Sequence, residues 1–167
     1  MYSMKISLHE DYFRSVMFGL QDGLVSTTGV VVGISAGVSD PAIIVMASFV
    51  AISVEASSMA AGEYSSEKAV HQLDKKGRHR DNLIKGATLM FFSYLLAGLI
   101  PISPFLIFSV DVARVISIAA ALVSLFAVGY FKGKIVKDRP LRSATEMLII
   151  GGLATAIGLV VGNFLKV

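Results

Sequence analysis

The sequence of 167 residues contains no cysteine, only four prolines and few charged residues, which make up 16% of the chain. The lack of cysteine excludes thiolate metal sites, disulfides and covalent haem attachment. With 54% hydrophobic residues, the chain is too apolar for an ordinary soluble domain. No HEXXH-like spacing or paired nucleophile and base is present, which argues against a membrane enzyme. The net charge of +3 does not indicate nucleic acid, because the basic residues lie in segments between apolar runs.

What the chain does contain is a series of long apolar runs. A transmembrane helix needs about 20 predominantly apolar residues, and we therefore expect an all-α, polytopic membrane protein with one domain over residues 1–167. The expected spans cover about 16–38, 41–64, 84–105, 112–131 and 144–165, with a charged connector at about 71–83. Residues 1–14 lack the short apolar core and cleavage site of a secretory signal, so the first span is expected to act as its own insertion signal.

Local signals predict where several of these helices begin or break. Asp40 and Pro41 suit the N-cap and the first helical position of the second helix. Prolines 101 and 104 are expected to break the third helix near its end. Glu146 follows Ser143 by three residues, which predicts a capping box at the start of the fifth helix.

The distribution of basic residues predicts the orientation in the membrane. Of the 15 Lys and Arg residues, 13 lie in the N-terminal segment, in the 71–83 connector with its flanks, or between the fourth and fifth spans. By the positive-inside rule, these segments are cytoplasmic. We therefore expect the N-terminus inside and the C-terminus outside.

An ionisable side chain at membrane depth is costly and by default marks an ion pathway or a buried pair. Asp22 lies eight residues beyond Arg14, about 12 Å into the membrane from the cytoplasmic side. Glu55 lies about 9 Å from the same side of a ~30 Å core, because the second helix runs the opposite way. Met59 is one turn nearer the cytoplasm, so the three side chains are expected in nearly one layer.

Further carboxylates extend this layer toward the cytoplasm. Glu63 and Glu67 continue the four-residue repeat of Glu55 and Met59, while Asp11 lies three turns before Asp22 on the same face. Carboxylates with a thioether and waters suit Fe²⁺, Mn²⁺ or Co²⁺, whereas Mg²⁺ and Ca²⁺ gain nothing from methionine. We predict Asp22, Met59, Glu55 and Glu63 as metal-binding residues, and Asp11 and Glu67 as residues of proton coupling or cytoplasmic access.

Each of these residues also has a simpler interpretation. Met59 alone is typical of core packing. Glu63 and Glu67 lie where the second helix is expected to leave the membrane, where ordinary solvated charges are equally expected. Asp22 and Glu55 are harder to explain as structural residues, because burying a charge at their depth costs free energy even when the charge has no function.

Glycines recur every four residues at 29, 33 and 37 in the first helix. Such small faces let another helix approach closely, often in a dimer. Together with residues 21–26 (QDGLVS), residues 58–65 (SMAAGEYS) and the glycines near the end of the fifth helix, this helix resembles the vacuolar iron transporter family, which includes yeast and plant vacuolar iron and manganese carriers and nodulin-like relatives.

The resemblance implies a homodimeric five-helix carrier that moves Fe²⁺ or Mn²⁺ out of the cytoplasm in exchange for protons. It also implies that the pathway lies at the dimer interface, that Asp22 and Met59 hold the ion, and that Asp11 matches an acidic residue on the cytoplasmic side. The metal is then the transported substrate, and no tightly bound cofactor is expected. The expected partners are the lipid bilayer, a second copy of the chain, metal ions and protons.

The sequence departs from the family in two places. Gln21 stands where Asn or Ser usually precedes the aspartate, and the short basic connector at 71–83 replaces the long glutamate-rich metal-binding domain of iron-handling plant members. If the activity depends on that domain to collect metal, either this protein works at lower affinity or its substrate differs. The short form resembles archaeal or bacterial members, which implies the cytoplasmic membrane of a prokaryote; in a eukaryote the vacuolar membrane takes its place.

Three functions remain open from the sequence. A secondary metal carrier explains the intramembrane carboxylates, and a passive channel would differ from it in needing no proton gradient. A non-transporting scaffold or regulatory subunit that assembles through the glycine faces would leave Asp22 and Glu55 unexplained. Five spans are few for a carrier with its own internal repeat, which favours a pathway built between two copies.

Overall fold

The computed structural model describes residues 3–74 and 82–165, and for residues 3–9 the backbone only. The described residues form helices and short turns without strands. In chain order the elements are α1 (Ser3–Gly37), α2 (Pro41–Leu73), α3 (Leu83–Ile102), the 3-10 helix η1 (Ser103–Leu106), α4 (Val110–Val136) and α5 (Pro140–Phe164). All five α-helices are long and apolar enough to cross a membrane. The expected all-α polytopic fold is confirmed, and the chain is an integral membrane protein.

Helices α1, α2, α4 and α5 extend beyond the expected spans, because their polar ends continue the same backbone hydrogen bonding, whereas α3 ends at Ile102 and is followed by η1. The expected span at 41–64 lies within α2, which continues to Leu73. Most of the expected connector at 71–83 lies outside the described residues, which resume at Asn82, the N-cap of α3.

The predicted start of the second helix is confirmed. The side chain of Asp40 accepts a hydrogen bond from the backbone N–H of Ala42 at 2.8 Å, and Pro41 occupies the first turn. Pro101 lies inside the last turn of α3, and the chain then tightens into η1.

The predicted capping box in α5 is wrong. The helix begins at Pro140 after Arg139, so Ser143 already lies in the first turn and cannot cap it. The hydroxyl of Ser143 is buried without a hydrogen-bond partner, and Glu146 pairs with Arg142 at 3.0 Å instead.

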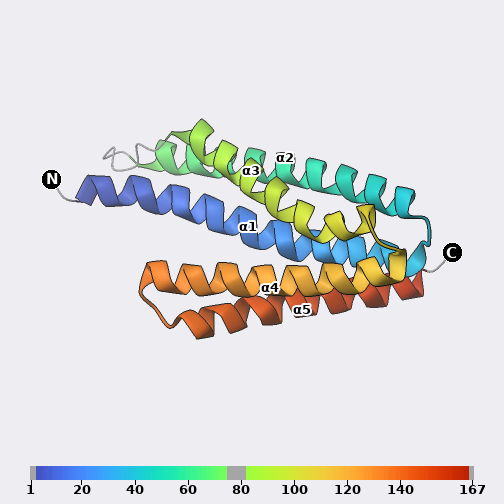
Figure 1. Cartoon of the computed structure of the whole chain (residues 1–167). Helices are drawn as coiled ribbons and strands as arrows, with labels where there is room; N and C mark the ends of the chain where they lie inside the picture. Colours follow the sequence, from blue (N-terminus) through green and yellow to red (C-terminus); the bar gives the residue numbers. More distant parts are fainter. Residues whose placement is uncertain (1–2, 75–81, 166–167) are drawn as a thin grey trace.

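Helix α1 is the central element of the bundle. Figure 1 shows α2 and α3 on one side of it and α4 and α5 on the other. It packs most extensively against α3 and α5, while its contact with α2 is smaller. The residues that position the candidate site therefore come mainly from the α1–α3 side of the bundle.

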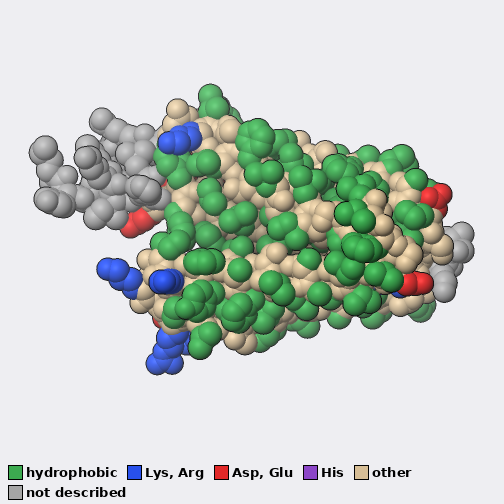
Figure 2. Space-filling model, in the orientation of Figure 1, with side chains coloured by type: hydrophobic (Ala, Val, Ile, Leu, Met, Phe, Trp, Pro, Cys, Tyr) green, Lys and Arg blue, Asp and Glu red, His purple; other side chains and the backbone are tan. Residues whose placement is uncertain are grey.

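The outside of the bundle is apolar over most of its length. Figure 2 shows hydrophobic side chains over the visible face, and large exposed apolar residues occur on all five helices. In Figure 2, basic side chains lie near the start of α3 and around the turn between α4 and α5, at one end of the bundle. We call this end of the bundle the basic end. An apolar belt with charges at the ends is the surface that a lipid bilayer requires.

Candidate metal pathway

Three helices meet at a group of hydrogen-bonded side chains inside the apolar belt. Tyr94 of α3 donates a hydrogen bond to Oε2 of Glu55 in α2, and Oγ of Ser26 in α1 lies 3.2 Å from the same oxygen. The hydroxyls of Ser26 and Tyr94 also lie close to each other, but each carries one hydrogen, which it donates to Oε2. We call Ser26, Glu55 and Tyr94 the Glu55 triad. It ties α1, α2 and α3 together around one carboxylate.

Tyr94 reaches the triad because α1 and α3 approach closely. A Cβ atom at Gly19 would lie 2.8 Å from the carbonyl oxygen of Met90, and one at Gly23 would collide with the backbone of Tyr94. Any larger residue at these two positions would push α3 away. Tyr94 is fully buried, at 0% exposure, and a buried tyrosine hydroxyl requires a polar partner.

Sequence reasoning missed both Tyr94 and Ser26. The signal that points to Tyr94 is a hydroxyl-bearing aromatic in an otherwise apolar run. Choosing its partner, however, requires knowledge of which faces of α1 and α2 meet it.

Asp22 and Met59 each lie one helical turn from a member of the triad. Asp22 precedes Ser26 by four residues, one turn along α1. Met59 follows Glu55 by four residues and packs against the apolar cluster that contains Tyr94. The structure therefore places Asp22, Glu55 and Met59 close to one three-helix junction. Within the described part of the chain, Asp22 forms no ion pair with a basic residue.

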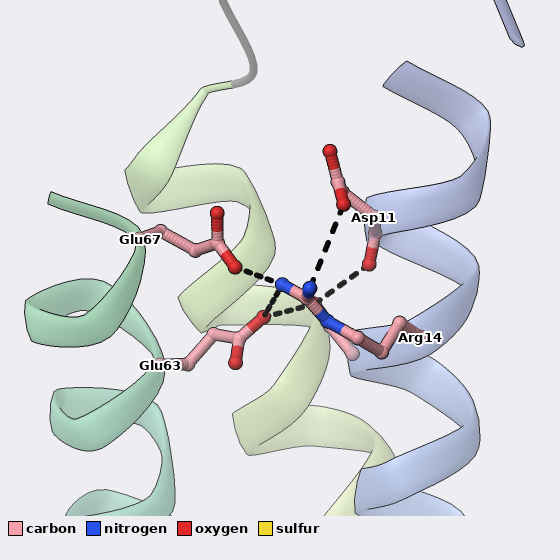
Figure 3. Close-up of polar contacts among 5 residues, drawn as sticks. Asp11, Arg14, Glu63 and Glu67 are labelled. Carbon is pink, nitrogen blue, oxygen red and sulfur yellow. Dashed lines mark hydrogen bonds and ion pairs between the residues drawn. The ribbon is translucent and has the colours of Figure 1, made fainter. Parts of the chain in front are cut away.

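The carboxylates nearer the basic end gather around Arg14 instead (Figure 3). The Arg14 guanidinium lies 3.7 Å from Asp11 and 3.8 Å from Glu63, and it pairs directly with Glu67. We call these four residues the Arg14 cluster. Ser15 also donates a hydrogen bond to Glu63. Glu67 is buried, at 7% exposure, whereas the Arg14 side chain is 56% exposed.

The expected ladder of carboxylates is thus divided into two groups. Glu55 and Glu63 are eight residues apart on α2, which corresponds to about 12 Å along the helix. In the part of the chain that the structure describes, the first group has no basic partner, whereas an arginine lies within the second. Among the described residues, no three His, Asp or Glu side chains converge into a metal site. An ion bound within one chain would therefore depend on Met59, on hydroxyl or carbonyl oxygens, or on water.

An apolar groove of about 660 Å³ continues from the triad toward the opposite end of the bundle, between α1 and α5. Ser26 belongs to both the groove and the triad, and Gly29, Gly33 and Gly37 follow it along the groove. Gly29 and Gly33 also bring α1 onto α5, since a Cβ at Gly33 would lie 2.9 Å from the carbonyl oxygen of Gly158. The glycine face of α1 therefore packs within the chain and also borders an open groove.

Comparison with known proteins identifies the family. A profile of the VIT family matches residues 13–83 and 69–163. Vacuolar iron transporter 1 of Oryza sativa subsp. japonica is 38% identical over 74 residues, which cover 44% of this chain and 29% of the rice protein. Vacuolar iron transporter homolog 2 of Arabidopsis thaliana is 24% identical over 162 residues, covering 90% of this chain and 83% of that protein.

A similar protein also occurs in an archaeon. An uncharacterised protein of Methanocaldococcus jannaschii is 29% identical over 163 residues, covering 86% of this chain and 84% of the relative. The match to the rice transporter, by contrast, spans less than a third of that protein's length. The VIT family consists of transporters rather than enzymes, and because its profile matches almost the whole sequence, this chain belongs to the VIT family.

Proposed function

We propose that this protein is a secondary transporter that exports Fe²⁺ or Mn²⁺ from the cytoplasm, with Co²⁺ as a further substrate, in exchange for protons. The observation that carries the proposal is the pair of carboxylates, Asp22 and Glu55, near one three-helix junction inside the apolar belt. Charges at this depth are costly unless they serve an ion or a proton. The plant relatives, named as vacuolar iron transporters and their homologues, support iron as the substrate.

In this proposal, Asp22, Glu55 and Met59 hold the metal during its passage. Two carboxylates and a thioether form a donor set that favours Fe²⁺, Mn²⁺ or Co²⁺ over ions that bind oxygen alone. Glu63, with Asp11 and Glu67, attracts cations at the basic end, where Arg14 limits the excess of negative charge. The same carboxylates exchange protons as the metal leaves. The metal is cargo, and no tightly bound cofactor is needed.

We further propose that the basic end faces the cytoplasm, with the N-terminus inside, and that two chains form a homodimer. The positive-inside rule supports this orientation. The dimer is supported by the open apolar groove beside the Glu55 triad and by the incomplete set of ligands in one chain. Two grooves brought together would enclose a pathway between Gly29, Gly33 and Gly37 of each copy.

Metal uptake into proteoliposomes with an imposed pH gradient tests the proposal, using Fe²⁺, Mn²⁺, Co²⁺ and Zn²⁺ in turn. Flux is expected to follow the gradient, to collapse in Asp22→Ala and to fall strongly in Met59→Ala. Asp111→Ala is the matched control, because Asp111 is an exposed carboxylate in the first turn of α4, away from the basic end. Flux that ignores the gradient would indicate a channel. Wild-type flux no greater than in empty liposomes would favour the scaffold.

A further inference from the structure

The Glu55 triad contains a feature that the proposed transport alone does not require. Both hydroxyls of the triad lie on the same carboxylate oxygen, Oε2 of Glu55. Within the described part of the chain, no donor reaches the other oxygen, Oε1. Each carboxylate oxygen offers two lone pairs, so two donors on one oxygen leave that atom without a free site.

We propose that Tyr94, assisted by Ser26, is a specificity-determining residue that restricts Glu55 to one metal-binding oxygen and thereby selects against Ca²⁺. This inference rests on the proposed function, since it assumes that Glu55 faces the transported ion. Tyr94 is a positioning residue, because it acts through Glu55 and not by touching the metal.

The coordination chemistry gives the direction of the effect. Ca²⁺ takes six to eight oxygen ligands at about 2.3–2.6 Å, and bidentate carboxylates are a common way to supply them. A carboxylate limited to one oxygen supplies one ligand fewer. Losing one ligand lowers the affinity most for the ion with the largest coordination shell. Met59 cannot replace the lost ligand, because Ca²⁺ gains nothing from a thioether. Smaller transition-metal ions, which accept fewer ligands and a sulfur donor, lose less.

The packing around Tyr94 explains how the restriction is maintained. The ring is fully buried, and the close approach of α1 at Gly23 fixes the backbone of Tyr94. Ser26 and Glu55 lie on two other helices, and the packed ring of Tyr94 holds its hydroxyl beside both. The helix packing therefore fixes the donor side of the one-oxygen geometry of Glu55.

Equilibrium binding of Mn²⁺ to the purified protein, followed by the loss of its free-ion EPR signal, tests the inference without requiring transport. Ca²⁺ is added as competitor. In Tyr94→Phe, Oε2 is released from one of its two donors. The ratio measured is the Ca²⁺ concentration that displaces half of the bound Mn²⁺, divided by the dissociation constant for Mn²⁺. This ratio is expected to fall about tenfold, the lower limit of the effects seen when partners of metal ligands are removed. A purely structural role would weaken both ions equally and leave this ratio unchanged.

Two further variants complete the test. Ser26→Ala is expected to shift the ratio in the same direction by a smaller factor, and it carries the test should Tyr94→Phe fail to fold. Tyr130→Phe is the matched control, because its ring stacks on Phe126 at an exposed position of α4. An unchanged ratio in both triad variants overturns the inference. A wild-type protein that binds Mn²⁺ selectively but does not transport it would contradict only the proposed function, and one that binds neither ion would contradict both.

Discussion

Arg14 places one positive charge among three carboxylates at the basic end. Because a nearby cation repels an arriving divalent ion, Arg14→Gln is expected to lower the KM for Mn²⁺ uptake. At a separation of several ångströms in a water-like dielectric, the repulsion is about 1 kcal/mol, or about fivefold in KM. Initial uptake rates over a range of Mn²⁺ concentrations measure this effect, which should shrink at high ionic strength.

The control for this prediction is Lys68→Gln. It removes a cation from the same end of the bundle, but the Lys68 ammonium lies 5.9 Å from the ring centroid of Tyr64 and not among carboxylates. A KM that stays the same or rises in Arg14→Gln would indicate that Arg14 serves only to hold α1 against α2.

The residues that sequence reasoning found and those it missed differ in the information they require. The neighbourhood of Asp22 and Glu55 could be predicted from helical rise alone, since the turn at Asp40 fixes the two helices antiparallel. Arg14 and Tyr94 could not be assigned partners in the same way. Their contacts depend on the rotation of each helix about its own axis, and the apolar composition of these helices leaves that rotation unspecified.

At the scale of the helices, α1 and α5 owe their close packing to glycine. Gly158→Ala would place a methyl group against the backbone of Gly29, so the helices must separate, at a cost of about 1–3 kcal/mol. Thermal unfolding in detergent should show a Tm lower by several degrees. Gly152→Ala in the same helix is the control, because nothing lies within 4 Å of its added methyl group. Equal Tm values for both variants would mean that α5 can shift relative to α1 without a loss of stability.

The existence of each helix could be predicted because an apolar run of membrane length has few structures open to it other than a transmembrane helix. The ends were less predictable. The helices α2 and α4 continue beyond their apolar spans to Leu73 and Val136, where polar side chains support the helix equally well. The predicted capping box failed because Ser143 lies inside the first turn of α5, where its backbone is already helical.

The assembly is testable at the scale of the whole molecule because the chain contains no cysteine. Ile34 lines the groove on α1, so Ile34→Cys in membranes is expected to give a dimer with a short thiol-specific crosslinker. Val123→Cys is the control, because Val123 is 70% exposed on α4 and lies outside the groove. If the Ile34→Cys protein transports metal but stays monomeric under these conditions, the proposed pathway at the dimer interface is wrong.

The odd number of membrane-length helices has a consequence for how such a protein can be duplicated. Among the described residues, the five membrane-length helices leave the described ends of the chain at opposite ends of the bundle (Figure 1). Two copies in the same orientation therefore cannot be joined head to tail by a soluble linker, because the linker would have to cross the bilayer. A tandem gene encoding a parallel pair needs a sixth hydrophobic segment between its halves, whereas a directly fused pair would insert its second half upside down.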